Sequence, residues 1–237
     1  MKRPEFANNE LYHICNRGVA NLKIFNDAKD YLHFLLGLKE FNTPKNIDIR
    51  ILFHLRKHKI KPINEADPKH PLVDIAAYCL MSNHFHLILR QRVENGMVLF
   101  MQKLGTGFSM YINKRHKISG HLFQGKFQAT HITSGDQLLY TSAYIHLNPV
   151  KKREDQLLTM KMTEEQIKRA IAYPWSTLGE YMLNFINPAS LPIELKWAKP
   201  TIDKHIIESM LNNAPYKRYL LDLWGKKSFV ELDKKML

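Results

Sequence analysis

Two apolar runs joined by only two residues constrain the fold of this chain more than any other feature. The runs are "LVDIAAYCLM" and "HFHLILRQ", and Ser82-Asn83 separates them. This spacing predicts an antiparallel hairpin with a two-residue turn, in which we expect Asn83 to tolerate the positive φ that such turns demand. His84 and His86 then share one strand face, since successive side chains alternate. Two adjacent imidazoles form half of a metal site, although the wetter face of a half-buried strand also accommodates two histidines.

The region before the hairpin is predicted to be a strand followed by a helix. The strand covers Leu11–Cys15 and ends at a turn that contains Gly18. The segment "NDAKDYLHFLLGLKEF" follows, with Asn26 or Asp27 as N-cap and apolar residues at helical spacing. Residues 42–71 mix proline and basic residues with a short apolar stretch, which indicates an insertion or a surface excursion.

Two helices are predicted after the hairpin. "GMVLFMQKLGTGFSMYINKRH" keeps apolar residues at helical spacing and leads into "NKRHKISGHLFQGKFQ", which is basic and interleaved with aromatic residues. In "SGDQLLYTSAYIHLNPVKKR", Ser134 and Gln137 stand three apart as a capping box, and Pro149 closes the segment. The segment 190–237 has mixed helix signals and no recognisable chemistry.

The charge of the chain indicates a polyanionic partner. The 237 residues include 35 Lys and Arg against 22 Asp and Glu, a formal net charge of +13. Nucleic acid is the commonest polyanion for such a protein. No run approaches bilayer-spanning length, and the N-terminus lacks the apolar core of a signal peptide, so we expect a cytoplasmic protein with no membrane partner. Cys15 and Cys79 lie in apolar strand-like runs, which favours free buried thiols.

Tyr140, Tyr144 and Asn148 recur every four residues and therefore share one face of the last predicted helix. A divalent ion held by two histidines would polarise a phosphodiester, and a tyrosine hydroxyl could attack its phosphorus and hold the cut end covalently. The chain has no Gly-rich phosphate loop of the G-x-x-x-x-G-K-[ST] kind. Taken singly, Tyr144 also fits an aromatic that packs on the sheet, and Asn148 fits a polar cap before Pro149.

Five segments, in order, resemble a known family. They are "YHICNRG" at 12–18, "YCLMSNHFHLIL" at 78–89, "YINKRHKISGHLFQGKF" at 111–127, "YIHLNPV" at 144–150 and "YPWST" at 173–177. On these motifs the chain resembles the single-tyrosine HUH (IS200-like) transposases, in particular the REP-associated tyrosine transposases of bacteria. It departs from them at Ser82, where the family commonly has proline.

The resemblance implies an α+β fold: a ferredoxin-like antiparallel sheet with helices packed on one face, plus a mainly helical C-terminal extension. It implies a catalytic domain over residues 1–180, with the insertion around 42–71, and an extension of unknown role over 181–237. The implied activity is cleavage and transfer of single-stranded, hairpin-flanked DNA through a covalent 5′-phosphotyrosine, with Mg²⁺ or Mn²⁺. The protein would act as a monomer or homodimer.

The resemblance also implies roles for individual residues. His84 and His86 map onto the metal ligands, Tyr144 onto the nucleophile and Asn148 onto a further metal ligand, with Tyr140 as the competing nucleophile. A non-catalytic DNA-binding regulator and a metal-dependent nuclease without a covalent intermediate remain alternatives. Basic and aromatic side chains are the candidates for DNA binding, each also compatible with a solvated surface position: Arg17, Arg115, His121, Phe123, Gln124, Lys126, Lys151, Lys152 and Arg153.

Overall fold

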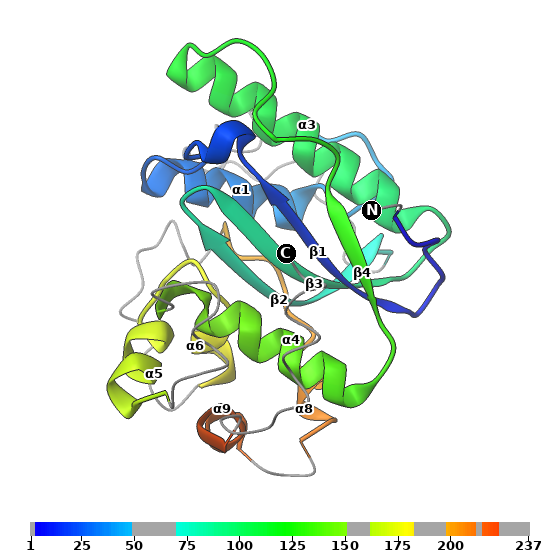
Figure 1. Cartoon of the computed structure of the whole chain (residues 1–237). Coiled ribbons are helices and arrows are strands. Elements are labelled where there is room, and N and C mark those ends of the chain that lie inside the picture. Colours follow the sequence, from blue (N-terminus) through cyan, green and yellow to red (C-terminus); the bar gives the residue numbers. More distant parts are fainter. Residues whose placement is uncertain (1–2, 49–69, 151–161, 183–197, 212–214, 223–237) are drawn as a thin grey trace.

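The computed structural model describes residues 3–48, 70–150, 162–182, 198–211 and 215–222. A four-stranded antiparallel sheet with the order β2-β3-β1-β4 lies at its centre (Figure 1). Its first part runs strand, helix, strand, strand, helix, strand, which is the ferredoxin-like order. The predicted fold class is therefore confirmed. These elements are β1 (Leu11–Arg17), α1 (Ala28–Glu40), β2 (Val73–Met81), β3 (His84–Gln91), α3 (Gly96–His116) and β4 (Gln128–Ile132).

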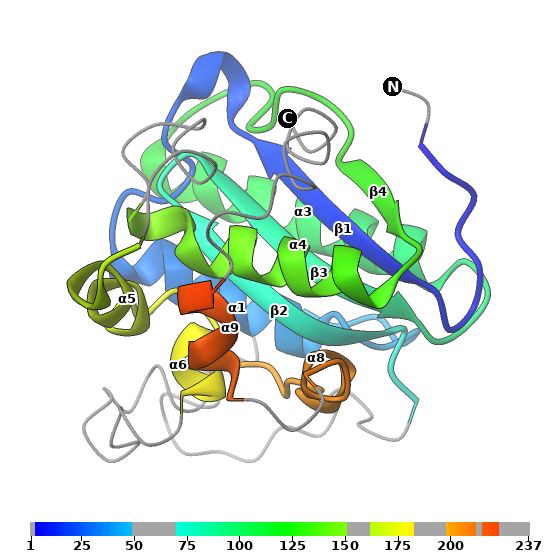
Figure 2. The ribbon, with the colours of Figure 1, turned by 60° about the horizontal axis from the view of Figure 1, so that its bottom comes forward.

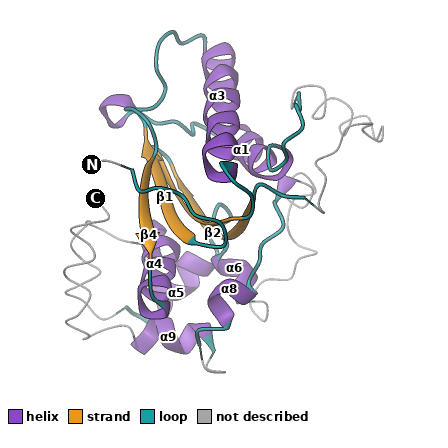
Figure 3. Ribbon diagram, turned by 90° about the vertical axis from the view of Figure 1, so that its right-hand side faces the viewer, coloured by secondary structure: helices purple, strands orange, loops and turns teal. Residues whose placement is uncertain are grey.

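The prediction that helices pack on one face of the sheet is wrong in this respect, because helices cover both faces and bury an apolar core on each. Figure 3 shows α1 and α3 on one face, as the fold class requires, and α4 on the other. Figure 2 shows the remaining described helices gathered around α4. These elements are α4 (Gly135–Leu147), α5 (Glu164–Ile171), α6 (Leu178–Tyr181), α8 (His205–Glu208) and α9 (Tyr216–Asp222); short 3₁₀ turns lie at η1 (Val19–Asn21) and η2 (Asn148–Val150).

Alternation along the strands produces two separate cores. On β3, Phe85 and Leu87 are buried against α1 and α3, whereas Ile88 belongs to the core beneath α4. Both faces of the hairpin are thus buried, which explains why its strands are almost uniformly apolar. His84 and His86 interrupt this pattern on the α4 face, so two polar rings lie at the edge of an apolar core.

The predicted helix starts are present in the structure. The Asp27 carboxylate accepts hydrogen bonds from the backbone N–H groups of Lys29 and Asp30, at 2.9 and 3.4 Å, and caps α1. Ser134 Oγ accepts from the Gln137 N–H at 3.2 Å and caps α4. Only one of the two hydrogen bonds of the predicted capping box forms. The Gln137 carboxamide oxygen accepts from the N–H of Thr133, the residue before the N-cap Ser134, and not from the N–H of Ser134 itself.

The hairpin turn at Ser82-Asn83 is confirmed, but its expected backbone conformation is wrong. Among the described residues, Asn83 is not one of those with positive φ. The loop after β1 donates hydrogen bonds to the turn: Ile24 N–H to the Ser82 carbonyl at 2.8 Å and Gly18 N–H to the Asn83 carbonyl at 2.8 Å. Tertiary contacts therefore fix this turn, where the sequence suggested a local glycine-like conformation.

Two predictions fall largely outside the described residues. Most of the insertion around 42–71 lies in residues 49–69, and most of the extension over 181–237 lies in residues 183–197, 212–214 and 223–237. The domain boundary near 180 stays a prediction. Within the predicted extension, Ile207, Tyr216 and Leu220 are buried in the same core as α4. None of the helices in the described ranges is long and apolar enough to cross a membrane.

Candidate active site

The two predicted histidines lie side by side at the start of β3. His84 follows the turn and is half-buried, whereas His86 is only 5% exposed. Their ring centroids are 5.0 Å apart and the rings are nearly perpendicular, at 83°. The two-residue periodicity of the strand causes this arrangement, because positions i and i+2 share a face.

Tyr144 reaches the same place from α4. Its ring centroid lies 5.6 Å from that of His86, edge to face at 89°, and the side chain is 3% exposed. Tyr140 is buried one turn earlier in the same core. Asn148 caps the C-terminus of α4 and is half-buried, and Pro149 follows in η2. The structure thus brings Tyr144 to His86, and Asn148 follows Tyr144 by one helical turn.

Each histidine of the pair has its Nδ1 in a hydrogen bond. His84 Nδ1 lies 2.7 Å from the Asn83 amide oxygen, and His86 Nδ1 lies 2.9 Å from His13 Nε2. The amide oxygen can only accept, so His84 carries its proton on Nδ1 and presents the lone pair of Nε2. Metal-binding histidines commonly have such a partner on the other ring nitrogen.

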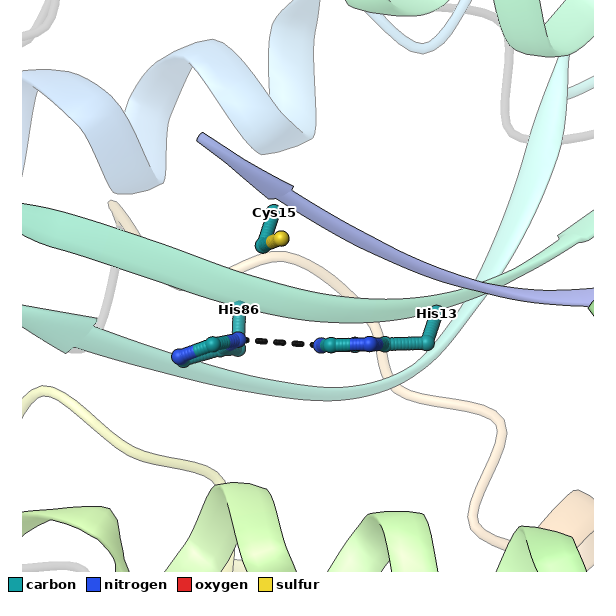
Figure 4. A group of neighbouring side chains, drawn as sticks. All are labelled: His13, Cys15 and His86. Carbon is teal, nitrogen blue, oxygen red and sulfur yellow. Dashed lines mark hydrogen bonds between the residues drawn. The ribbon is translucent and has the colours of Figure 1, made fainter. Parts of the chain in front are cut away.

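His13 and Cys15 are the residues of this site that sequence reasoning missed. Both lie on β1, where Cys15 is the direct strand partner of His86. Within the described residues, one ligand atom each from His13, Cys15 and His86 lie within 4.8 Å of one another (Figure 4). Burial raises the pKa of the Cys15 thiol to about 11, so the thiol is neutral at pH 7. The alternation of "YHICNRG" places His13 and Cys15 on one face, but the local sequence does not show that this strand pairs with the strand that carries His86.

Four predicted DNA contacts line a single groove. The groove has a volume of about 940 Å³ and lies between α3 and the loop before β4. The loop is tied to the end of β1, since the Gln124 N–H donates to the Arg17 carbonyl at 2.9 Å. Arg17 is in turn the strand partner of His84, so the groove and the histidine pair share one end of the sheet. The four predicted residues are His121, Phe123, Gln124 and Lys126.

Arg115 lies in a structural ion pair. Its guanidinium binds the Asp27 carboxylate at 2.5 Å and also the fully buried carboxylate of Asp30. The hydrogen bonds to Asp27 and Asp30 raise the pKa of Arg115, and the Arg115 hydrogen bond is the main cause that lowers the pKa of Asp27 to about 2. Arg115 therefore links α3 to α1. Lys151, Lys152 and Arg153 fall outside the described residues.

A comparison with protein families identifies part of the chain. Residues 54–148 match the family model described as "Transposase IS200 like". These residues are similar to that family, and we call residues 54–148 the IS200-like segment. This segment includes the hairpin and α4, hence His84, His86, Tyr144 and Asn148, so the resemblance noted in the sequence is confirmed over this range.

Among the solved structures that are similar to this chain is one described as a REP-associated tyrosine transposase bound to a REP hairpin. It has a TM-score of 0.49 and 12% sequence identity, covering 81% of this chain and 90% of that chain. None of the curated proteins matches the chain significantly.

The residues of the IS200-like segment fit a divalent ion. His84 and His86 provide neighbouring imidazoles, and the Asn83 oxygen fixes the proton of His84 on Nδ1, so Nε2 is the nitrogen that would coordinate an ion. An amide oxygen from Asn148 would add an oxygen ligand, and mixed imidazole and oxygen ligation accommodates several divalent ions, Mg²⁺ and Mn²⁺ among them. The half-buried position of His84 keeps the pair open to solvent on one side.

Proposed function

We propose that this chain is a DNA endonuclease and strand transferase that cuts single-stranded, hairpin-flanked DNA through a covalent 5′-phosphotyrosine. The observation that carries the proposal is the approach of the Tyr144 ring to His86, 5.6 Å between centroids, on the strand face that also holds His84. Packing of Tyr144 on the sheet does not by itself account for two histidines beside its ring, whereas metal-assisted chemistry at Tyr144 does. The net charge of +13 supports a polyanionic substrate.

In this proposal Tyr144 is the nucleophile. Its hydroxyl oxygen forms a bond to phosphorus while the bond to the 3′ oxygen breaks, and the tyrosyl proton leaves to solvent as the 3′ hydroxyl takes one up. The step is reversible, because a 3′ hydroxyl can later attack the phosphotyrosine and release the enzyme. Tyr144 is 3% exposed, so most of its ring is enclosed between α4 and the sheet.

His84, His86 and Asn148 would hold Mg²⁺ or Mn²⁺ at this position. The bound ion supplies electrostatic stabilisation of the charge that develops on the phosphate oxygens. The protein side chains position the ligands and the nucleophile relative to one another. Asn83 orients His84, and α4 directs Tyr144 toward the histidine pair.

The groove beside α3 is the proposed DNA-binding surface. Phe123 offers a ring for stacking on an unpaired base, which contributes about 1–3 kcal/mol per base in single-strand binders. Lys126 and His121 line the same groove and are suited to phosphate contacts, while Gln124 can donate and accept hydrogen bonds. Arg17 lies between the groove and His84, where a bound strand would pass toward the proposed site.

The direct test is incubation of the full chain with end-labelled hairpin single strands and Mn²⁺ or Mg²⁺. We expect an adduct that survives SDS with wild-type protein, and its loss in His84→Ala and His86→Ala. DNA binding by these variants should persist, because affinity derives mainly from phosphate contacts. His131→Ala, at a half-buried position on the edge strand β4, is the matched control.

Other outcomes of this experiment would contradict the proposal. Cleavage without an adduct would identify a metal-dependent nuclease, and binding without cleavage a DNA-binding regulator. Undiminished cleavage by both histidine variants would remove the metal site from the account.

A further inference from the structure

We propose that His13 is a positioning residue that holds His86 in the tautomer and ring orientation needed to bind the metal. The inference rests on the proposed function, because it concerns the same site. His13 lies on β1, outside the IS200-like segment at 54–148, so the family match assigns it no role.

The contact between the two rings is a buried, well-aligned hydrogen bond. His13 Nε2 and His86 Nδ1 are 2.9 Å apart, and the two side chains are 2% and 5% exposed. The interplanar angle is only 17°, with centroids 5.1 Å apart. Figure 4 shows the rings end to end, with the facing nitrogens joined and the other nitrogen of His86 directed away. Ring nitrogens aimed at each other in this way share a hydrogen bond, whereas ligands of one metal ion converge on a third point.

One proton lies between the facing nitrogens, and the ring that carries it determines whether Nε2 of His86 can coordinate an ion. If His13 donates, His86 must carry its own proton on Nε2, and that nitrogen cannot coordinate an ion. If His86 donates from Nδ1, its Nε2 keeps an unprotonated lone pair. Metal binding at His86 therefore requires His13 to accept through Nε2, which makes His13 the counterpart of the Asn83 oxygen beside His84.

His13 also connects the histidine pair to the helix. Its ring lies edge to face with that of Tyr144, 6.5 Å between centroids at 74°. The ring of His86 is thus bounded by His13 from β1 and by Tyr144 from α4. Loss of the His13 acceptor would allow His86 to rotate or to change tautomer, without removing any ligand.

The test measures Mn²⁺ binding by the full chain without DNA, from the electron paramagnetic resonance signal of free Mn²⁺. His13→Phe keeps a ring but removes the acceptor, and should weaken Mn²⁺ affinity about 10- to 100-fold. His13→Gln places an amide oxygen at similar reach and should restore most of the affinity. His33→Phe is the matched control, since His33 is a buried histidine stacked on Tyr111 in the other core. His13→Leu serves as a second acceptor-free variant if the phenylalanine does not fold.

A second readout follows the tautomer directly. In ¹⁵N-histidine spectra of the metal-free protein, we expect the His86 proton on Nδ1 in the wild type and a mixed or Nε2-protonated ring in His13→Phe. A wild-type His86 protonated only on Nε2 would overturn the proposal.

The outcomes separate this inference from the proposed function. Failure of His84→Ala and His86→Ala to weaken Mn²⁺ binding would refute the metal site itself. Weaker binding in those two variants, with wild-type affinity in His13→Phe, would overturn only the positioning role. A thiolate-to-cobalt charge-transfer band with Co²⁺ that Cys15→Ser abolishes would make Cys15 a ligand. Such a band, together with equal losses of Mn²⁺ affinity in His13→Phe and His13→Gln, would place His13 in the same ligand set and would also overturn the positioning role.

Discussion

Burial sets the protonation state of His33, a histidine outside the proposed active site. His33 is 6% exposed and stacks on Tyr111, with ring centroids 3.6 Å apart. Burial lowers its pKa from 6.5 to about 4, against the opposing charge of Asp30. The imidazole is therefore neutral in the folded protein at pH 7 and resists protonation down to about pH 4.

The depressed pKa of His33 predicts a loss of stability in acid. Between pH 6.5 and 4 the unfolded chain binds a proton at this position and the folded chain does not. Stability from this group is therefore complete above about pH 6.5 and falls as the pH drops toward 4, by on the order of 3 kcal/mol. Urea unfolding at pH 7 and pH 4.5 should show a smaller pH effect in His33→Phe than in wild type. An equal pH effect in both proteins would contradict this assignment.

For single residues, the sequence predicts which side chains share a face of a strand or helix, because that depends only on local periodicity. Alternation alone was enough to place His84 and His86 on one strand face. His13 could not be found in this way, because its contact with His86 joins residues 73 positions apart and depends on the pairing of β1 with β3. The role of Arg115 was equally invisible, since its carboxylate partners lie on another helix.

Among the described helices, α4 is the most completely buried. Tyr144 faces the sheet, whereas Ser142 and His146 bind the hydroxyl of Tyr216 at 2.8 and 2.9 Å. His146 Nε2 also lies 2.8 Å from the Thr177 hydroxyl. Tyr216 on α9, from the predicted extension, and Thr177 therefore hold the outer side of the helix that carries the proposed nucleophile.

Removal of the Tyr216 hydroxyl should loosen this attachment. Tyr216→Phe leaves the buried Ser142 hydroxyl and His146 Nδ1 without that partner, which should cost about 1–3 kcal/mol. Thermal or urea unfolding measures the decrease in stability. Tyr219→Phe is the control, because Tyr219 stacks on Tyr216 from a half-buried position. Equal stability of Tyr216→Phe and wild type would show that the Tyr216 hydroxyl does not help to hold α4 in place.

Element boundaries were predictable where caps specify them. Asp27 and Ser134 begin α1 and α4 as expected, and Pro149 follows the end of α4. The face that α4 covers was not predictable, because all its residues from Leu138 to Leu147 are buried and no polar side marks the solvent. The Asn83 conformation was mispredicted for a related reason: contacts from the distant loop at 18–25 fix the turn.

For the whole molecule, the proposed function assigns separate contributions to DNA binding to the excess positive charge and to the groove. Lys126→Ala should reduce the dependence of affinity on salt, by a slope of about 0.7 for each single-strand phosphate that the protein no longer neutralises. Phe123→Ala should weaken binding by about 1–3 kcal/mol with little change in that slope, since stacking releases no counterions. Fluorescence anisotropy over a salt series measures both, with Lys168→Ala on α5 as control. Identical slopes for Lys126→Ala and wild type would exclude a phosphate-binding role for Lys126.

The central claim for the molecule is that Tyr144 forms a covalent bond to DNA, and adduct formation by two tyrosine variants tests it most directly. Tyr144→Phe removes the hydroxyl but keeps the ring that packs against His86. Tyr140→Phe makes the same change about one helical turn, roughly 5–6 Å, away in the same buried core. With labelled hairpin single strands and Mn²⁺, we predict no SDS-stable adduct for Tyr144→Phe and near wild-type adduct for Tyr140→Phe. An adduct that persists in Tyr144→Phe would contradict the account.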